Sequence, residues 1–373
     1  MNRVIVVGPD HQNTLAIIRA FGKEKYIVDL VIYGNMDRKD KCQKTKYFNG
    51  RYIKCQETEK SIIDAIYNLG KFDEKVPIIP TSDFAEMCLD NNYELLKKRY
   101  ILSAINDEEN KIVENMNKLN QKKLSEKYGI KMAKTSKIIL NNSFFRIDYQ
   151  YDYPCILKPV KSIEGEKSDI VIVKNDVELK KEILKYQEKG YSEVLIQEYI
   201  KKDYEVCIFG CLTKNTRDFY CGALKKIRYS PAGDGASLSY AKFISMEKKY
   251  YKIINILKEI GYNGLFDIEV FVVGNDLFLN EINFRNSGNA WSVIKRGINF
   301  PVIWVEDYKG EKIKEQHKTI KDGSFFMNET ADLKNVLKGK LNIFVWIKDL
   351  LKAKSFNKFW IHDIQGSIIW YIK

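Results

Sequence analysis

The feature that most constrains the fold of this chain is a pair of apolar strands joined by a tight turn. The first strand is predicted at Leu265–Val273 and the second at Asp276–Asn283, with Gly274-Asn275 as the turn between them. A Gly-Asn pair between two strand-forming runs is typical of a β-hairpin. The hairpin carries Glu269 on its first strand and Glu281 on its second. We expect these two carboxylates to face each other from one side of the sheet.

The hairpin also carries groups that suit a bound cation. Two carboxylates that lie close together repel each other unless a cation separates them. Asn283 follows Glu281 by two residues, so it shares the same face and adds a neutral oxygen of the kind Mg²⁺ accepts. Arg285 continues that face and can hold a substrate carboxylate or a phosphate. The alternative is a hairpin with a solvated acidic face.

A candidate phosphate-binding lysine lies upstream of the hairpin. Lys158 occupies the apolar run Pro154–Val160, where strand alternation places its cation on one face. The lysine can neutralise phosphate oxygens if the strand directs it into a cleft, and a solvated edge-strand lysine is the alternative. The polar stretch Lys161–Ser168 follows and can fold over phosphates with its backbone amides.

Two further features carry weaker signals. The segment Ile196–Ile200 ends a strand and can form a hinge, where backbone groups hydrogen-bond an adenine and Glu198 meets a ribose. An ordinary strand end is the alternative. Arg228 precedes the glycine-containing stretch Ser230–Gly235, where a cation can stabilise transition-state charge. Taken alone, an arginine in such a place is more often a surface arginine.

The start of the chain predicts a small parallel α/β lobe over about residues 1–110. Val4–Val7, a helical pattern and Val28–Ile32 indicate strand, helix and strand, and Val76–Pro80 indicates a further buried strand. A dinucleotide site is rejected here, because Gly8 stands alone where Gly-x-Gly-x-x-Gly is required. After this lobe, the alternation of strands and helices favours two α+β lobes with a cleft between them.

Composition narrows the classes of function. The seven cysteines are scattered without a CxxC pair, so we expect buried free thiols rather than a disulfide framework or a zinc knuckle. The net charge of +13 permits nucleic acid, anionic lipid or polyphosphate as a partner, but no nucleic-acid motif accompanies it. We see neither a signal peptide nor an apolar run of membrane-spanning length, so we expect a soluble, cytoplasmic protein.

The end of the chain is basic and contains tryptophans. Residues 333–373 hold eight lysines against two aspartates. A row of apolar residues falls near one helical face: Leu333, Leu337, Leu341, Phe344, Ile347 and Leu351. This pattern suits an anionic membrane surface or a partner protein. A helix packed on the core is the alternative.

Read in order, these segments resemble the ATP-grasp superfamily, in particular its carboxylate–amine ligase and carbamoyl-phosphate-synthase-like branch, which includes D-aspartate ligases. The resemblance covers about residues 1–310. Asn117-Lys118 before Lys123–Ile130 is similar to the family's Asp-Lys segment before a helix that ends in Gly-Ile. It implies that Lys118 and Lys158 contact phosphates, with Lys122 and Lys123 as alternatives to Lys118.

The resemblance implies roles for the remaining site residues. The adenine-binding hinge matches Gln197, Glu198, Tyr199 and Ile200, and an acidic position near the nucleotide or substrate matches Glu205. The ligands of Mg²⁺ or Mn²⁺ match Glu269, Glu281 and Asn283, and the arginines that contact the phosphates and the acyl group match Arg228 and Arg285.

Three positions near these motifs complete the comparison with the family pattern. Pro80–Asp83 resembles a loop of the preceding domain that borders the cleft in relatives. Asn117 stands where the family usually has Asp, and Phe284 stands where Glu-x-Asn-Pro-Arg frequently has Pro. Neither departure removes a phosphate-binding cation or a metal ligand.

The resemblance implies an α/β and α+β architecture with three successive domains. These are a Rossmann-like pre-ATP-grasp domain at residues 1–110, a two-lobed ATP-grasp domain at 111–310 with its hinge near 196–200, and an extension at 311–373. It implies an ATP-dependent ligase that uses ATP and Mg²⁺ or Mn²⁺ to join a carboxylate to an amine through an acyl phosphate. The alternatives are a kinase- or carboxylase-type relative and a non-catalytic nucleotide-binding module.

Overall fold

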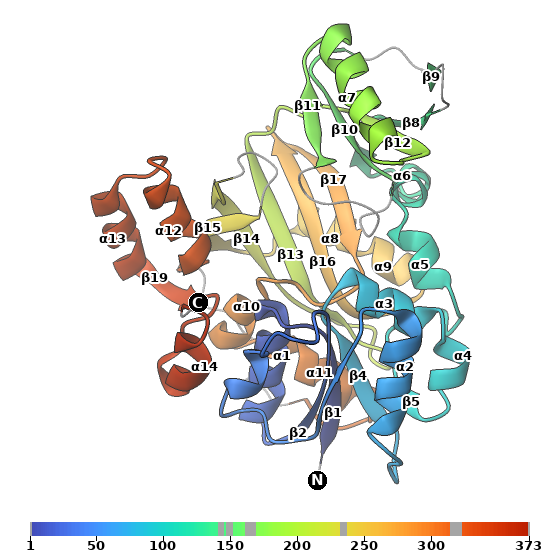
Figure 1. The fold of residues 1–373 in the computed structure, drawn as a ribbon, viewed down its shortest axis with the longest axis vertical. Coiled ribbons are helices and arrows are strands. Elements are labelled where there is room, and N and C mark those ends of the chain that lie inside the picture. The colour runs from blue at the N-terminus through green and yellow to red at the C-terminus, as the bar shows by residue number, and fades with distance from the viewer. Residues whose placement is uncertain are drawn as a thin grey trace. The chain divides into compact units, whose positions relative to one another are not determined.

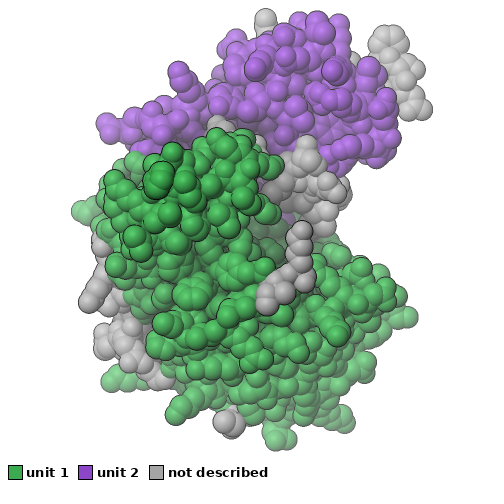
Figure 2. Space-filling view, turned by 60° about the vertical axis from the view of Figure 1, so that its left-hand side comes forward, with its two compact units in different colours: residues 1–113, 206–268, 283–373 green, residues 114–205, 269–282 purple. Residues whose placement is uncertain are grey.

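The structure, a computed structural model, describes residues 2–140, 145–146, 152–160, 169–231, 237–313 and 323–371. The chain forms two compact units, which Figure 2 colours separately. Unit 1 consists of residues 1–113, 206–268 and 283–373, and unit 2 consists of residues 114–205 and 269–282. The stretches Lys161–Ser168 and 232–236, which include most of the two predicted polar loops, lie outside the described residues.

Unit 1 begins with a five-stranded parallel sheet in the order β3-β2-β1-β4-β5. Its strands are β1 (Arg3–Pro9), β2 (Ile27–Tyr33), β3 (Tyr52–Cys55), β4 (Val76–Pro80) and β5 (Tyr100–Ile101). Its helices are α1 (Gln12–Lys23), α2 (Glu59–Asn68), α3 (Asp83–Asp90) and α4 (Tyr93–Leu96) (Figure 1). The central strands read as continuous apolar runs because helices cover both faces of such a sheet. The predicted α/β class is confirmed for this part of the chain.

Unit 2 contains a five-stranded sheet in the order β11-β10-β12-β8-β9, and its neighbouring strands are antiparallel. Its strands are β8 (Thr135–Leu140), β9 (Phe145–Arg146), β10 (Cys155–Pro159), β11 (Val171–Val173) and β12 (Glu193–Glu198). Helix α7 (Asp176–Glu188) packs on this sheet through Leu179, Ile183 and Tyr186. Helix α6 (Lys118–Lys127) also belongs to unit 2, and α5 (Lys111–Met116) precedes it in the chain.

The largest sheet follows the order β19-β18-β15-β14-β13-β16-β17-β7, and β6 pairs with β16. Its strands are β6 (Ala104–Ile105), β7 (Lys131–Met132), β13 (Tyr204–Leu212), β14 (Phe219–Tyr229), β15 (Leu238–Ile244), β16 (Tyr262–Val273), β17 (Asp276–Asn283), β18 (Phe325–Met327) and β19 (Ala353–Phe356). The predicted hairpin corresponds to β16 and β17. Gly274 in its turn has a φ of 56°, a left-handed conformation that favours glycine.

Helices between and after these strands complete unit 1. They are α8 (Lys248–Ile254), α9 (Ile256–Glu259), α10 (Ala290–Arg296), α11 (Phe300–Tyr308), α12 (Glu329–Leu337), α13 (Ile343–Lys352) and α14 (Ile364–Ile368), with short 3-10 turns η1 (Cys42–Lys44) and η4 (Ile361–Asp363). All seven cysteines are free and buried, as the sequence predicts. Within the described ranges, no helix has both the length and the apolar character needed to cross a bilayer.

The C-terminal residues divide into a packed part and an exposed part. The buried guanidinium of Arg19 on α1 forms a 2.8 Å ion pair with Asp363, and Tyr47 stacks on Trp360 with ring centroids 5.0 Å apart. These contacts attach the last residues to unit 1. The single predicted helical face over Leu333–Leu351 is wrong in one respect. Gly339, with a φ of 67°, ends α12, and Asn342 caps the separate helix α13.

Candidate functional site

Two buried lysines gather near Glu281 in unit 2. Lys158 on β10 is 6% exposed and Lys118 at the start of α6 is 8% exposed. The Nζ atom of Lys118 lies 3.8 Å from Glu281 Oε1. The Nζ atom of Lys158 donates a 2.7 Å hydrogen bond to Gln197 Oε1. Lys158 is therefore a buried cation and not the solvated edge-strand lysine that the sequence left as an alternative.

The local electrostatics suit an anion. The pKa of Lys158 is lowered to about 7, mainly by burial and also by the nearby charge of Lys118, while the carboxylate of Glu281 acts in the opposite direction. Two lysines beside one carboxylate leave a net positive charge in a largely dehydrated place. A phosphate oxygen at this point would stabilise the charged form of Lys158.

Helix α6 sets the position of Lys118. Asn117 caps the helix by accepting a 2.9 Å hydrogen bond from the Leu119 amide, so this departure from the family pattern keeps a capping side chain. One turn later, Gln121 exchanges hydrogen bonds of 2.8 and 2.9 Å with the backbone of Ile282 on β17. This contact brings Lys118 beside Glu281 and favours Lys118 over the more exposed Lys122.

Contacts within unit 2 also hold the residues of the predicted hinge. The side-chain amide of Gln197 bridges Lys158 and Thr135 Oγ1, with the second hydrogen bond at 2.8 Å. Glu198 pairs with Lys134, since its amide donates to the Lys134 carbonyl at 2.8 Å and its carboxylate accepts from the Lys134 amide at 3.2 Å. Glu205 is buried, 2.9 Å from Lys202 Nζ. The adenine contacts of Gln197–Ile200 and the ligand role of Glu205 stay predictions.

The candidate metal ligands supply the hard oxygen donors that Mg²⁺ prefers. Glu269 Oε2 accepts a 3.4 Å hydrogen bond from Asn280 Nδ2, and Glu281 lies near Lys118. Asn283 follows Glu281 on β17, and its Oδ1 accepts a 3.2 Å hydrogen bond from Arg285. No group of three His, Cys, Asp or Glu side chains suited to a metal occurs in the part of the chain that the structure describes. The predicted metal site consists of two carboxylates and one amide. That these three side chains bind one metal ion together stays a prediction.

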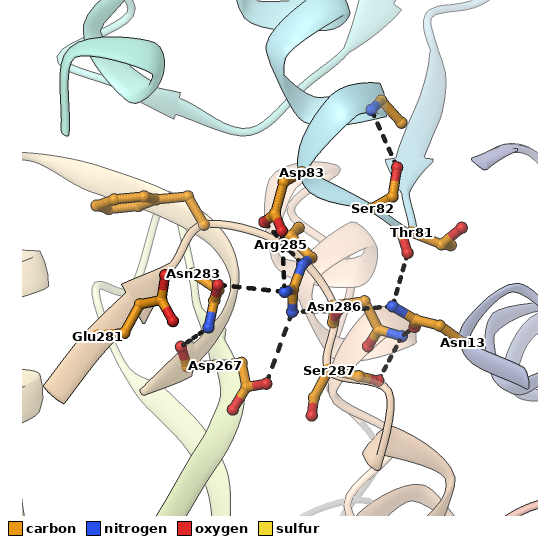
Figure 3. Close-up of polar contacts among 12 residues, drawn as sticks. Asn13, Thr81, Ser82, Asp83, Asp267, Glu281, Asn283, Arg285, Asn286 and Ser287 are labelled. Carbon is orange, nitrogen blue, oxygen red and sulfur yellow. Dashed lines mark hydrogen bonds and ion pairs between the residues drawn. The ribbon is translucent and has the colours of Figure 1, made fainter. Parts of the chain in front are cut away.

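Arg285 in unit 1 is braced by two carboxylates (Figure 3). Its Nε donates to Asp83 Oδ1 at 2.9 Å, and its Nη1 lies 3.6 Å from Asp267 Oδ2. Asp83 is the first residue of α3 and the last residue of Pro80–Asp83, which resembles a family loop. The structure thus brings this loop to Arg285, whose guanidinium is held in a fixed orientation.

An adjoining network was missed from the sequence. Asn13 Nδ2 donates to the carbonyls of Thr81 and Asn286 at 2.7 and 2.8 Å (Figure 3). The hydroxyls of Thr14 and Thr81 lie 2.7 Å apart. These side chains are buried. They come from segments far apart in the chain, so no local pattern indicates them. The sequence reasoning also missed Asp267, which pairs with Arg285. A carboxylate on an otherwise apolar strand was a signal that could have indicated it.

A small cavity in unit 1 adjoins Arg285. Its lining includes Glu86, Ser103, Phe284 and Trp304. Glu86 is 1% exposed and accepts a 2.6 Å hydrogen bond from Ser103. Burial raises the pKa of Glu86 well above its usual range, and the charges of Asp90 and Asp83 act in the same direction.

Arg228 on β14 lies in a different part of unit 1. Its guanidinium contacts Asp332 at 2.7 Å and Asp349 at 2.6 Å, and it stacks over the ring of Tyr240 at 4.3 Å. These contacts favour a structural role, in which Arg228 ties α12 and α13 to the sheet. Its predicted catalytic role stays a prediction.

Comparison with known families decides the type of fold. The model of the ATP-grasp domain family matches residues 123–294. This chain contains an ATP-grasp domain. The matched range includes Lys158, the predicted hinge and the β16–β17 hairpin, and it confirms the resemblance drawn from the sequence motifs.

Curated relatives match only part of this chain. A formate-dependent phosphoribosylglycinamide formyltransferase of a Nitratiruptor species is 27% identical over 176 residues, which are 46% of this chain and 44% of the relative. The enzyme of the same name from Prochlorococcus marinus is 25% identical over 166 residues, 43% of this chain and 42% of the relative. The chain thus spans less than half the length of these relatives.

Solved structures match more of the chain and show its fold. A carboxyaminoimidazole ribonucleotide synthase from Aspergillus clavatus with ATP has a TM-score of 0.66 at 14% identity, covering 88% of this chain and 82% of that one. The N5-carboxyaminoimidazole synthetase of Staphylococcus aureus gives 0.63 at 16%, covering 91% and 88%. An L-amino acid ligase from Bacillus licheniformis gives 0.60 at 13%, covering 87% and 78%. The predicted ATP-grasp fold is confirmed.

Proposed function

We propose that the chain is an ATP-dependent carboxylate–amine ligase, which forms an amide or peptide-type bond and releases ADP and phosphate. The observation that carries this proposal is the group of Lys118, Lys158 and Glu281 in unit 2. Two buried lysines beside a carboxylate, one with a pKa of about 7, suit a nucleotide's phosphates. An ATP-grasp domain supplies the context for this group.

The nucleotide-binding residues act before the chemistry. Lys118 and Lys158 hold phosphate oxygens, while the backbone of Gln197–Ile200 contacts the adenine and Glu205 contacts the nucleotide or substrate. The hydrogen bond from Lys158 to Gln197 links the phosphate-binding lysine to the predicted hinge strand β12. Glu269, Glu281 and Asn283 would hold Mg²⁺ or Mn²⁺, which when bound offsets the negative charge of the phosphates.

The reaction consists of two balanced steps. An oxygen of the substrate carboxylate attacks the γ-phosphorus, the bond from that phosphorus to the β–γ bridging oxygen breaks, and ADP leaves with the bridging oxygen. The amine nitrogen then attacks the acyl carbon of the acyl phosphate. The bond from that carbon to the phosphate oxygen breaks, phosphate leaves, and the nitrogen loses a proton.

Arg285 is proposed to orient the carboxylate for the first step. Two anions repel each other, so a fixed cation that touches the carboxylate lowers the barrier to their approach. The ion pairs of Arg285 with Asp83 and Asp267 support this role, because they fix the guanidinium before substrate binds. Its Nη2 and Nη1 also donate to Asn283 Oδ1 and the Asn286 carbonyl, each at 3.2 Å, so a substrate carboxylate would replace one of these contacts.

The names of the relatives suggest which carboxylates to test first. A formate-dependent formyltransferase and an L-amino acid ligase point to formate and amino acids, and the carboxyaminoimidazole synthetases point to bicarbonate. We would screen mixtures of these with amines for substrate-dependent ADP release and identify products by mass spectrometry. Lys158→Met should lower turnover by at least about 100-fold, since it removes a phosphate cation from a dehydrated site.

A matched control separates this effect from a general loss of lysine charge. Lys137 lies on β8 in the same sheet, is exposed and pairs with Glu193 at 2.8 Å. Lys137→Met should retain wild-type turnover. Equal turnover in the two variants would remove Lys158 from the nucleotide site, and release of AMP with pyrophosphate would contradict the proposed reaction.

A further inference from the structure

The α12–α13 hairpin of unit 1 exposes an apolar surface. We call this surface the hairpin patch, and its residues are Leu333, Leu337, Ile343, Phe344, Val345, Ile347 and Leu351. Leu337 and Phe344 are each 77% exposed and Leu351 is 75% exposed. Helix α13 has no buried residue, and Figure 1 shows it on the outer side of α12. Several exposed apolar side chains on one surface indicate an interaction site, whereas single exposed apolar residues are normal.

The hairpin patch is held firmly on unit 1. Arg228 reaches α12 through Asp332 and α13 through Asp349, at 2.7 and 2.6 Å. Ser239 adds a 2.7 Å hydrogen bond to Asp332, which is fully buried. Both helices are therefore anchored by their polar side. Phe344, Ile347 and Leu351 recur at helical spacing on α13, so they share one face.

The charge around the patch is positive. Five exposed lysines lie on or next to its helices and make no ion pair with any described residue: Lys334, Lys338, Lys348, Lys352 and Lys354. Of the carboxylates on these two helices, Asp332 and Asp349 pair with Arg228, and Glu329 is buried and accepts hydrogen bonds from the amides of Asn357 and Phe359. The apolar face is consequently bordered by cations whose charge no local carboxylate offsets.

We infer that the hairpin patch docks this chain on an anionic lipid surface. An amphipathic helix binds such a surface by placing its apolar face at the acyl boundary while lysines meet the lipid phosphates. Helix α13 has ten residues and is about 15 Å long, which suits a helix lying in the interface. A second copy of the chain is a poorer occupant, because pairing two patches would bring two sets of five lysines together.

Binding of the full chain to vesicles tests this inference. Wild-type protein should co-sediment with vesicles of phosphatidylglycerol and phosphatidylcholine, and the binding should weaken as salt rises to about 0.5 M. Phe344→Gln with Leu351→Gln should weaken binding by at least about tenfold, since both side chains are exposed and apolar. Lys348→Gln with Lys352→Gln should weaken it by about 25-fold, or about fivefold for each lysine.

A second exposed apolar pair provides the matched control. Val177 and Leu184 on α7 of unit 2 are 77% and 58% exposed and lie outside the patch. Val177→Gln with Leu184→Gln should bind like wild type, and circular dichroism should show all variants folded. The inference is overturned if wild type fails to bind anionic vesicles or binds phosphatidylcholine equally well. It is also overturned if Phe344→Gln with Leu351→Gln leaves binding unchanged, or instead breaks a dimer seen in light scattering.

Discussion

At the scale of single residues, the protonation of Lys158 links the structure to a measurable property. Burial and Lys118 hold its pKa at about 7 in the protein without ligand. A bound phosphate favours the charged form, so nucleotide binding must take up a proton whenever the pH exceeds this pKa. We predict that ADP affinity falls between about pH 7.5 and about pH 9, by at most about tenfold per pH unit.

Calorimetry checks the sign of this effect. Titrations of ADP in buffers of different ionisation enthalpy should show proton uptake by wild type at the higher pH. Lys158→Met should bind ADP weakly and without that uptake, while Lys137→Met should behave like wild type. A wild-type affinity that stays constant over this range would mean that Lys158 does not contact phosphate.

Glu86 gives a second prediction for a residue, in the stability of the fold. Burial raises its folded pKa well above the unfolded value, so the stability linked to its protonation is present at low pH and is lost as the pH rises through the folded pKa. Glu86→Gln keeps the size of the side chain and cannot ionise. We predict that the urea midpoint of this variant rises relative to wild type between about pH 5 and about pH 8.

The exposed residue Glu94 supplies the control for this measurement. Glu94→Gln should have the wild-type urea midpoint at about pH 5 and at about pH 8, because the Glu94 side chain is 55% exposed in its ion pair with Lys97. If Glu86→Gln also has the wild-type urea midpoint at about pH 5 and at about pH 8, Glu86 is ionised in the folded protein and burial does not raise its pKa.

Sequence reasoning about residues succeeded where a local pattern existed. Strand alternation selected Lys158, and the structure buries it near Lys118 and Glu281. The network of Asn13 and Asn286 had no such pattern, since each residue is polar and unremarkable in its own segment. Only the folding of α1 against the residues after β17 makes these side chains buried partners.

At the scale of elements, the close approach of β1 to the loop after β4 can be tested. A Cβ at Gly8 would lie 1.8 Å from Thr81 Oγ1, so the strand end requires glycine because of space. We predict that Gly8→Ala destabilises the protein by about 1–3 kcal/mol in chemical denaturation. Removing the hydroxyl as well, in Gly8→Ala with Thr81→Ala, should give a smaller loss than the sum of the single losses. Strict additivity would contradict the close contact.

Elements with strong local signals were predicted closely. The structure has β4 at Val76–Pro80 and β17 at Asp276–Asn283, as the sequence indicates. Helices α5 and α6 are separate, because Asn117 caps the start of α6. The short strands β18 and β19 were not predicted, since two to four apolar residues acquire strand geometry only by pairing with a distant partner.

At the scale of the whole molecule, Asp83 on α3 pairs with Arg285, and these two residues of unit 1 are 202 residues apart in the sequence. If this ion pair orients Arg285 for chemistry, Asp83→Asn should lower kcat by about 100-fold while the affinity for ADP changes little. Steady-state kinetics and ADP titration together separate the two effects. Equal losses in kcat and ADP affinity would indicate a general structural defect instead.

The central claim is that the substrate carboxylate becomes an acyl phosphate, and isotope transfer tests it most directly. The carboxylate found by the ADP-release screen would be labelled with ¹⁸O and allowed to react with ATP and the amine. In the proposed reaction, one carboxylate oxygen remains on the γ-phosphorus when the amine displaces phosphate. Each turnover should therefore release ADP together with inorganic phosphate that carries one ¹⁸O atom, as measured by mass spectrometry. Inorganic phosphate without the label, or label in AMP formed with pyrophosphate, would contradict the account.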